Sequence, residues 1–369
     1  MKNTNQLTVT RFFAALTVVI FHYGKKIWPF TVYPWSELIP TGHIFVNYFF
    51  VLSGFIMAMV YFRPGEKFQT GRYWVHRLAR IYPIYLLGLL MTILLNTKLL
   101  RDRMAVALNG TLLQAWLPPY PNTLNYPGWS LSVEAFFYLI FPLLLWLSYR
   151  LTFRTNAILI SFFWGASLAG HTYLLNTFYT GFPSFSYDIL FYNPVFHLNA
   201  FLLGCLGGRW FVEIASQKHA QTIPNLLTLA GSFVLICLSL LYLKDLPKMA
   251  GFNIKLGLAN GSLAPLFLLA IATLARDESG FAQTLRRPWL VLLGDASYTL
   301  YILQFPVHTA YKQYIETHFT QWPNEFHFWA YLLLLIVLSI ATFLLIEVPL
   351  RTAIQKGWQK FQKRRIATA

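Results

Sequence analysis

Long apolar runs constrain the fold of this chain more than any other feature. Each run is long enough to cross about 30 Å of hydrocarbon as a helix. Charged residues make up only 11% of the sequence, against roughly 25% in soluble domains. We therefore predict an all-α fold, a polytopic transmembrane helical bundle of about ten spans. The predicted spans lie at about 8–24, 42–62, 80–96, 129–149, 156–174, 193–211, 223–243, 256–275, 289–310 and 328–348.

The basic residues are distributed unevenly about these spans. With the N-terminus inside, the cytoplasmic segments hold 20 of the 29 lysines and arginines, as the positive-inside rule requires. We therefore expect both termini to be cytoplasmic, with a transmembrane domain over 1–350 and a basic tail over 351–369. Because the basic residues are distributed in this way between the two sides of the membrane, the net charge of +16 does not indicate a nucleic-acid partner.

The first span, LTVTRFFAALTVVIFHYG, carries two ionisable residues, Arg11 and His22. They are eleven residues apart, so they share one helical face about 16 Å apart along the axis. Ionisable residues inside a membrane are costly and mark a functional site by default. This face is therefore predicted to line a polar cavity. The alternative is that Arg11 reaches the headgroups while His22 lies at the opposite interface.

A basic cluster follows the second span in RYWVHRLARIYPIY (72–85). Arg72, Arg77 and Arg80 lie there with His76, at the cytoplasmic mouth of the third span. The planar donor fork of arginine suits phosphate groups, so the three arginines are candidates for binding an anionic cofactor. The same cluster would also satisfy the positive-inside rule without any ligand.

The fourth span begins with PGWSLSVEAFFYLIFP (127–142). Ser130, Glu134 and Tyr138 recur there at intervals of four on one helical face, which places a carboxylate about one turn inside the membrane. A buried carboxylate needs a partner. The pattern leaves open whether Glu134 pairs with an arginine or orients His22.

Two further spans contain polar residues that point to substrate contacts. Ser53 precedes Gly54 in FVNYFFVLSGFIMA (45–58), a pair that suits close helix packing at least as well as substrate binding. The ninth span reads LGDASYTLYILQFPVH (293–308). The candidate substrate-binding residues are Ser53, Trp129, Ser130, Tyr298 and Gln304. The sequence contains no glycine-rich phosphate loop and no zinc-type spacing, so we expect no metal.

The predicted outer loops are rich in aromatic residues, proline and asparagine. They read WPFTVYPW (28–35), WLPPYPNTLNYPGW (116–129), FYTGFPSFSYD (178–188) and WPNEFHFW (322–329). Aromatic faces suit the C–H faces of sugars, and Asn, Asp and Tyr can hydrogen-bond to hydroxyls. A carbohydrate-facing surface is one reading. An ordinary aromatic belt is the other, and it explains the Trp and Tyr well but the clustered Pro and Asn less well.

Six motifs along the chain resemble, in this order, those of the acyltransferase-3 family of membrane O-acyltransferases. They are Arg11 with His22, FFVLSGF, RLARIYPIY, WSLSVEAFFYLIFP, LGDASYTLYIL and IEVPLR. The resemblance implies transfer of an acyl group, usually acetyl from acetyl-CoA, to a hydroxyl of a bacterial surface glycan or glycolipid. It implies that His22 is catalytic with Arg11 as its motif partner, and that the arginines after the second span are functional. It also implies an integral protein of the bacterial inner membrane, surrounded by membrane lipids.

Two positions depart from the family pattern. Gln304 stands where many family members have a histidine, and His308 lies four residues further along the same helical face. Arg77 and Arg80 are three apart, whereas the family motif is often Arg-x-Arg. The resemblance therefore does not assign a separate role to each arginine.

The chemistry of acyl transfer agrees with these residues. The enzyme must deprotonate a hydroxyl and stabilise an oxyanion, and an imidazole such as that of His22 exchanges protons near neutral pH. We expect CoA to dock from the cytoplasm on the arginines and to thread its thioester toward His22. Transfer first onto a protein group remains an alternative step, and Glu134 is a further catalytic candidate.

A transporter or flippase for a lipid-linked glycan is the alternative function. Such a protein would also have about ten spans, charges within the membrane and aromatic loops. Transporters often show repeated halves with broken helices in matching positions. Here most of the motifs lie within residues 11–142 instead, which favours an enzyme.

Overall fold

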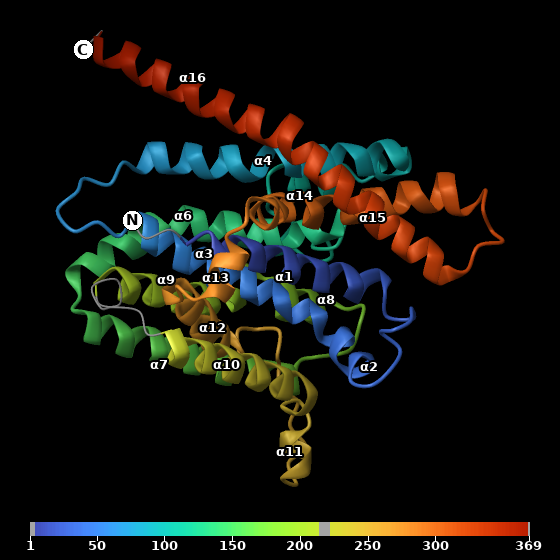
Figure 1. Cartoon of the computed structure of the whole chain (residues 1–369), viewed down its shortest axis with the longest axis horizontal. Helices are drawn as coiled ribbons and strands as arrows, with labels where there is room; N and C mark the ends of the chain where they lie inside the picture. Colours follow the sequence, from blue (N-terminus) through green and yellow to red (C-terminus); the bar gives the residue numbers. More distant parts are fainter. Residues whose placement is uncertain (1–3, 214–221, 368–369) are drawn as a thin grey trace.

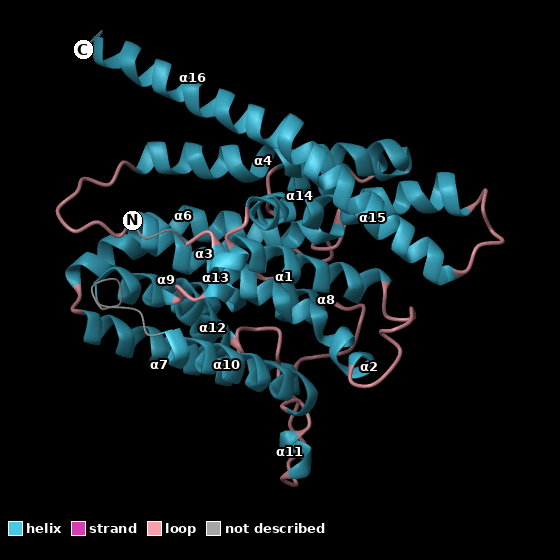
Figure 2. Cartoon of the chain, in the orientation of Figure 1, coloured by secondary structure: helices cyan, strands magenta, loops and turns pink. Residues whose placement is uncertain are grey.

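The computed structural model describes residues 4–213 and 222–367, which form helices and connections without any strand (Figure 2). Nine helical segments within these residues are long and apolar enough to cross a membrane, which confirms the predicted class of polytopic bundle. Their main helices are α1 (Gln6–Tyr23), α3 (Phe45–Tyr61), α4 (Thr70–Leu95), α6 (Trp129–Arg150), α7 (Phe153–Thr177), α9 (Leu198–Glu213), α10 (Thr222–Tyr242), α14 (Pro288–Tyr311) and α15 (Asn324–Thr342).

Shorter elements connect or extend these spans. The short α-helices are α2 (Trp35–Leu38), α5 (Arg103–Gly110), α8 (Phe185–Tyr192), α11 (Leu246–Met249), α12 (Ala264–Arg276) and α13 (Gly280–Leu285). The 3-10 turn η4 (Tyr126–Gly128) leads into α6. The π-helical turn η8 (Phe343–Glu347) joins α15 to a last helix, α16 (Val348–Ala367). The apolar stretch 104–117, between the third and fourth predicted spans, forms α5 and a 3-10 turn at Gln114–Trp116.

The predicted span 256–275 is only partly helical. α12 has 13 residues, about 20 Å, which is too short to cross a bilayer, and the chain before it is irregular. Carbonyl groups of this irregular segment accept hydrogen bonds from side chains of three spanning helices, Asn47, Trp164 and Asn199. Irregular backbone is tolerated at membrane depth where protein groups satisfy it, and hydropathy cannot reveal such partners.

The spanning helices lie roughly side by side along the long axis of the molecule (Figure 1). α1 packs against α14, and α3 packs against α9 and α12. The N and C labels both lie at the left of Figure 1, where the 62–69 connection between α3 and α4 is also found, whereas α2 lies at the right. This arrangement agrees with the predicted topology, and the cytoplasmic assignment of the left side stays a prediction.

Glycines bring the backbones of α3 and α9 into close contact. A Cβ atom added at Gly54 would lie 2.2 Å from the carbonyl oxygen of Phe201, and one added at Gly204 would lie 2.1 Å from that of Val51. Small residues at helix interfaces permit such an approach within membranes. The structure therefore supports the packing interpretation of Gly54.

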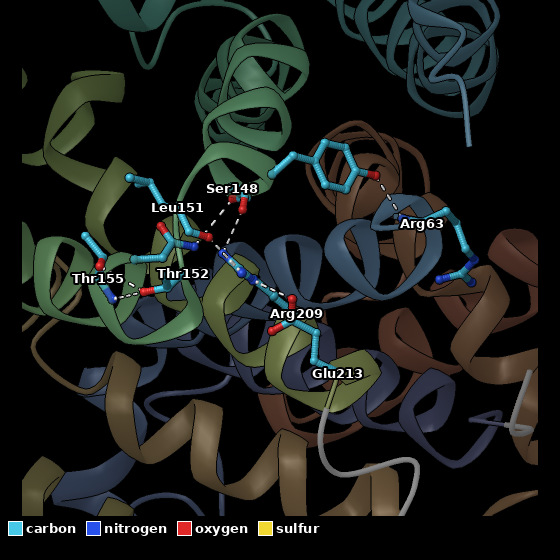
Figure 3. Close-up of polar contacts among 9 residues, drawn as sticks. Arg63, Ser148, Leu151, Thr152, Thr155, Arg209 and Glu213 are labelled. Atoms are coloured by element: carbon cyan, nitrogen blue, oxygen red, sulfur yellow. Dashed lines mark hydrogen bonds and ion pairs between the residues drawn. The ribbon is translucent and has the colours of Figure 1, made fainter. Parts of the chain in front are cut away.

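A buried arginine ties α9 to the end of α6 (Figure 3). Arg209, which is only 6% exposed, donates hydrogen bonds to the carbonyl oxygens of Ser148 and Leu151 at 2.8 and 3.0 Å, and to Glu213 at 3.0 Å. The last carbonyl groups of a helix have no intrahelical partners, and a cation is favoured near them. Arg209 thus caps α6 and fixes the position of the helix that carries Glu134.

Candidate active site

A polar cavity of about 70 Å³ lies in the middle of the bundle, between α1, α3, α4, α6 and α14. We call it the central cavity. Six of the residues predicted from the sequence line it, although they come from five different helices: Arg11, Ser53, Arg80, Ser130, Glu134 and Tyr298. The fold therefore brings most of the sequence motifs to one place.

Two arginines face this cavity. Arg11 comes from α1 and Arg80 from α4. In the described part of the chain neither guanidinium makes a hydrogen bond or an ion pair within 4 Å. Arg11 does interact electrostatically with Glu134 and Arg80 over a longer distance. Their donor groups are thus available to a bound polar ligand, which supports the cavity interpretation of Arg11 over the interfacial one.

Glu134 lies in the same cavity and is hydrogen-bonded there. Its Oε1 atom accepts from the hydroxyl of Ser53 at 3.3 Å and from the hydroxyl of Tyr138. It shares this cavity with Arg11 and Arg80, and no hydrogen bond joins it to His22 in the described residues. Of the two alternatives for Glu134, this shared cavity favours pairing with an arginine.

Two more carboxylates belong to this charged cluster, and the sequence did not single out either as a site residue. Asp295 lines the central cavity and interacts electrostatically with Arg11 and Arg80. Glu347 is 3% exposed, accepts a hydrogen bond from Thr299 at 2.8 Å and lies 3.7 Å from Arg351. Both residues sit in the quoted motifs LGDASYTLYIL and IEVPLR, and a carboxylate within an apolar run was the available signal.

The three arginines of the basic cluster lie in different places. Arg80 faces the central cavity, whereas the guanidinium of Arg77 donates to the hydroxyl of Tyr61 at 2.9 Å and lies 5.7 Å from the ring of Tyr138. Arg72 is exposed and lines a separate hollow of about 390 Å³. The three therefore do not form one phosphate site.

We call the hollow at Arg72 the basic pocket. It lies where the 62–69 connection meets the ends of α3 and α4. Its charged and titratable lining residues are Arg63, Glu66, Lys67, Arg72 and His76. Three fixed positive charges against one negative charge give this pocket a net positive charge, at the end of the bundle predicted to be cytoplasmic.

His22 lies near the other end of α1 and does not line the central cavity. Its ring makes an edge-to-face contact with Tyr126, with the ring centroids 4.8 Å apart. The Tyr126 hydroxyl donates to that of Tyr23 at 3.1 Å, and Tyr23 stacks on His308 at 4.0 Å. An aromatic cluster thus surrounds His22, and it includes the histidine noted beyond Gln304.

Tyr126 lies in η4, directly before α6. Ser130, one turn further along in α6, lines the central cavity and donates a hydrogen bond to the hydroxyl of Tyr301, another lining residue, at 3.0 Å. The sequence did not single out Tyr126 or Tyr301. The basic pocket, the central cavity and His22 lie one after another along the bundle, because Arg72 and Arg80 are about 12 Å apart along α4 and Arg11 and His22 about 16 Å apart along α1.

Two predicted substrate contacts do not reach the cavity. The ring of Trp129 packs against His197 with the centroids 5.3 Å apart. Gln304 is completely buried, and its side-chain amide donates to the carbonyl oxygen of Tyr301 at 2.8 Å. Trp129 thus packs α6 against His197, whereas the hydrogen bond of the Gln304 amide stays within α14.

Comparisons with known proteins place the chain in a family. The model of an acyltransferase domain, Acyl_transf_3, matches residues 4–348. Acyltransferase MdmB of Streptomyces mycarofaciens is 28% identical over 324 residues, which cover 82% of this chain and 78% of MdmB. O-acetyltransferase OatA of Staphylococcus aureus is 24% identical, over 95% of this chain but only 57% of OatA. No solved structure matches the chain. Because the family model covers nearly the whole chain, this protein belongs to the acyltransferase-3 family.

Proposed function

We propose that this protein is a membrane O-acyltransferase that moves an acetyl group from cytoplasmic acetyl-CoA to a hydroxyl of an extracytoplasmic or lipid-linked glycan, with His22 as the general base. The observation that carries the proposal is the row of polar sites from the basic pocket through the central cavity to His22. The family, and relatives called acyltransferase MdmB and O-acetyltransferase OatA, support the reaction class.

The balance of charge suggests where each part of the donor binds. The basic pocket has an excess of positive charge and suits the phosphates of CoA, which arginine binds through charge-assisted hydrogen bonds. The central cluster balances Arg11, Arg80 and Arg351 against Glu134, Asp295 and Glu347. It therefore suits a neutral polar group, such as the pantetheine arm and the thioester.

The reaction balances without a metal or a redox cofactor. His22 takes the proton of the acceptor hydroxyl while the oxygen attacks the thioester carbonyl carbon. The carbon–sulfur bond breaks, and the proton passes to the departing CoA thiolate. Arg11 and Arg80 bind polar groups of the donor arm where it crosses the central cavity. In this scheme the ring of Tyr126 moves so that the thioester and His22 can meet.

The test compares surface glycans of cells that contain the protein with those of cells that lack it, by mass spectrometry. Acetyl esters should appear only with the intact protein and disappear with His22→Ala, while the amount of folded protein stays unchanged. His318→Ala removes an exposed histidine near the same end of the bundle and should retain the esters. Transport of an unmodified glycan by wild type and His22→Ala alike would support the flippase alternative instead.

A further inference from the structure

We propose that α16 is a binding surface for the anionic headgroups of phospholipids, at the face of the membrane where the C-terminus lies. The surface consists of Lys356, Lys360 and Lys363 together with the apolar side chains of Ile354 and Phe361. This inference is independent of the proposed acyl transfer, because none of these residues lines the central cavity or the basic pocket.

The length of the last helix carries α16 out of the hydrocarbon. The chain is helical without a break from Asn324 in α15 through η8 to Ala367, about 65 Å, more than twice the roughly 30 Å of the apolar layer. The ion pair of Glu347 with Arg351 marks the end of the apolar part. The remaining turns of α16 therefore begin at the membrane surface, and Figure 1 shows them leaving the bundle at an angle.

The side chains of α16 separate into two faces. Ile354, Trp358 and Phe361 follow the spacing of one helical face, and Lys356, Lys360 and Lys363 follow the same spacing on the opposite face. The three lysines are exposed, and Ile354 and Phe361 are 42% and 55% exposed. Residues 348–369 contain no Asp or Glu. A basic face opposite a face of exposed apolar side chains is typical of an amphipathic helix that lies at a lipid interface.

A contact with α4 holds this surface in place. Trp358 lies against Gly71, where an added Cβ atom would be 3.4 Å from the indole ring, and α16 packs along α4. Gly71 directly precedes Arg72 of the basic pocket. The lining residues of the pocket lie within 60–76, and the α16 lysines are not among them. Charge complementarity then points to lipid headgroups as their partner.

The test measures lipid binding to the full chain in detergent by native mass spectrometry, with phosphatidylglycerol and phosphatidylcholine as probes. The triple variant Lys356→Gln/Lys360→Gln/Lys363→Gln removes the basic face. Each lysine near an anionic surface contributes about fivefold, so the affinity for phosphatidylglycerol should fall by roughly 100-fold while that for phosphatidylcholine stays unchanged. The matched control Lys244→Gln/Lys248→Gln/Lys255→Gln removes three lysines around α11 and should bind phosphatidylglycerol like wild type.

A second variant separates charge from folding. Lys356→Arg/Lys360→Arg/Lys363→Arg keeps the charges and should keep the preference for phosphatidylglycerol. An unchanged preference in the glutamine variant, or an equal loss in the α11 control, would overturn the proposal. So would displacement of phosphatidylglycerol by inorganic phosphate or acetyl-CoA at matched concentration, because the lysines would then bind free phosphate groups rather than lipid.

Discussion

Replacing Glu134 by glutamine removes one negative charge from the central cavity and keeps the shape of the side chain and one acceptor oxygen. The hydrogen bonds from Ser53 and Tyr138 can then persist. What is lost is the longer-range attraction to Arg11, which makes no ion pair within 4 Å in the described residues. The variant therefore isolates the charge of Glu134.

The expected loss follows from the separation of the two charges. Arg11 and Glu134 interact electrostatically without forming a direct ion pair. Because no ion pair within 4 Å joins the two groups in the described residues, their attraction at an effective dielectric constant of about 20 is below about 4 kcal/mol. Asp295 also attracts Arg11 and offsets part of the loss. We expect Glu134→Gln to reduce the free energy of unfolding by about 2 kcal/mol.

Thermal melting in detergent and a double-mutant cycle with Arg11→Gln measure this loss. The cycle should give a coupling energy of about 2 kcal/mol. Glu325→Gln makes the same chemical change at an exposed position in the first turn of α15 and should melt like wild type. Native melting together with a coupling energy near zero would refute the pairing. Native melting with much lower activity and a shifted pH–rate profile would instead support orientation of His22.

Three further predictions test the donor site, the environment of His22 and the helix packing. Arg72→Gln should raise the KM for acetyl-CoA about 10- to 100-fold with little change in kcat. Arg287→Gln, at another exposed arginine, should leave this KM unchanged. Equal KM values for the two variants in steady-state kinetics would contradict phosphate binding by Arg72. Tyr126→Leu should lower kcat because the ring contact with His22 is lost. Tyr126→Phe keeps that ring and should keep most of the activity. An unchanged kcat in the leucine variant would show that the ring contact of Tyr126 with His22 does not affect turnover. Gly54→Ala should destabilise the protein by about 1–3 kcal/mol, because the added methyl group meets the Phe201 carbonyl. Gly231→Ala, with open space around it, should not lower the melting temperature.

Local patterns in the sequence were enough to predict the class and several site residues. Apolar runs report how each segment partitions into a bilayer, so the polytopic bundle follows from composition and run length alone. An ionisable residue inside such a run must find a polar environment. That rule identified Arg11 and Glu134 as candidate site residues from the sequence alone. The order of the motifs along the chain indicated the family.

Only the tertiary structure decided which of these residues share a cavity. Arg72, Arg77 and Arg80 are neighbours in the sequence, yet successive turns of α4 direct them to a pocket, a tyrosine cluster and the central cavity. Asp295 and Glu347 joined the charged cluster through contacts between helices far apart in the chain. The irregular segment before α12 also depends on distant side chains. Sequence spacing describes one helix face at a time, whereas helix packing determines which faces meet.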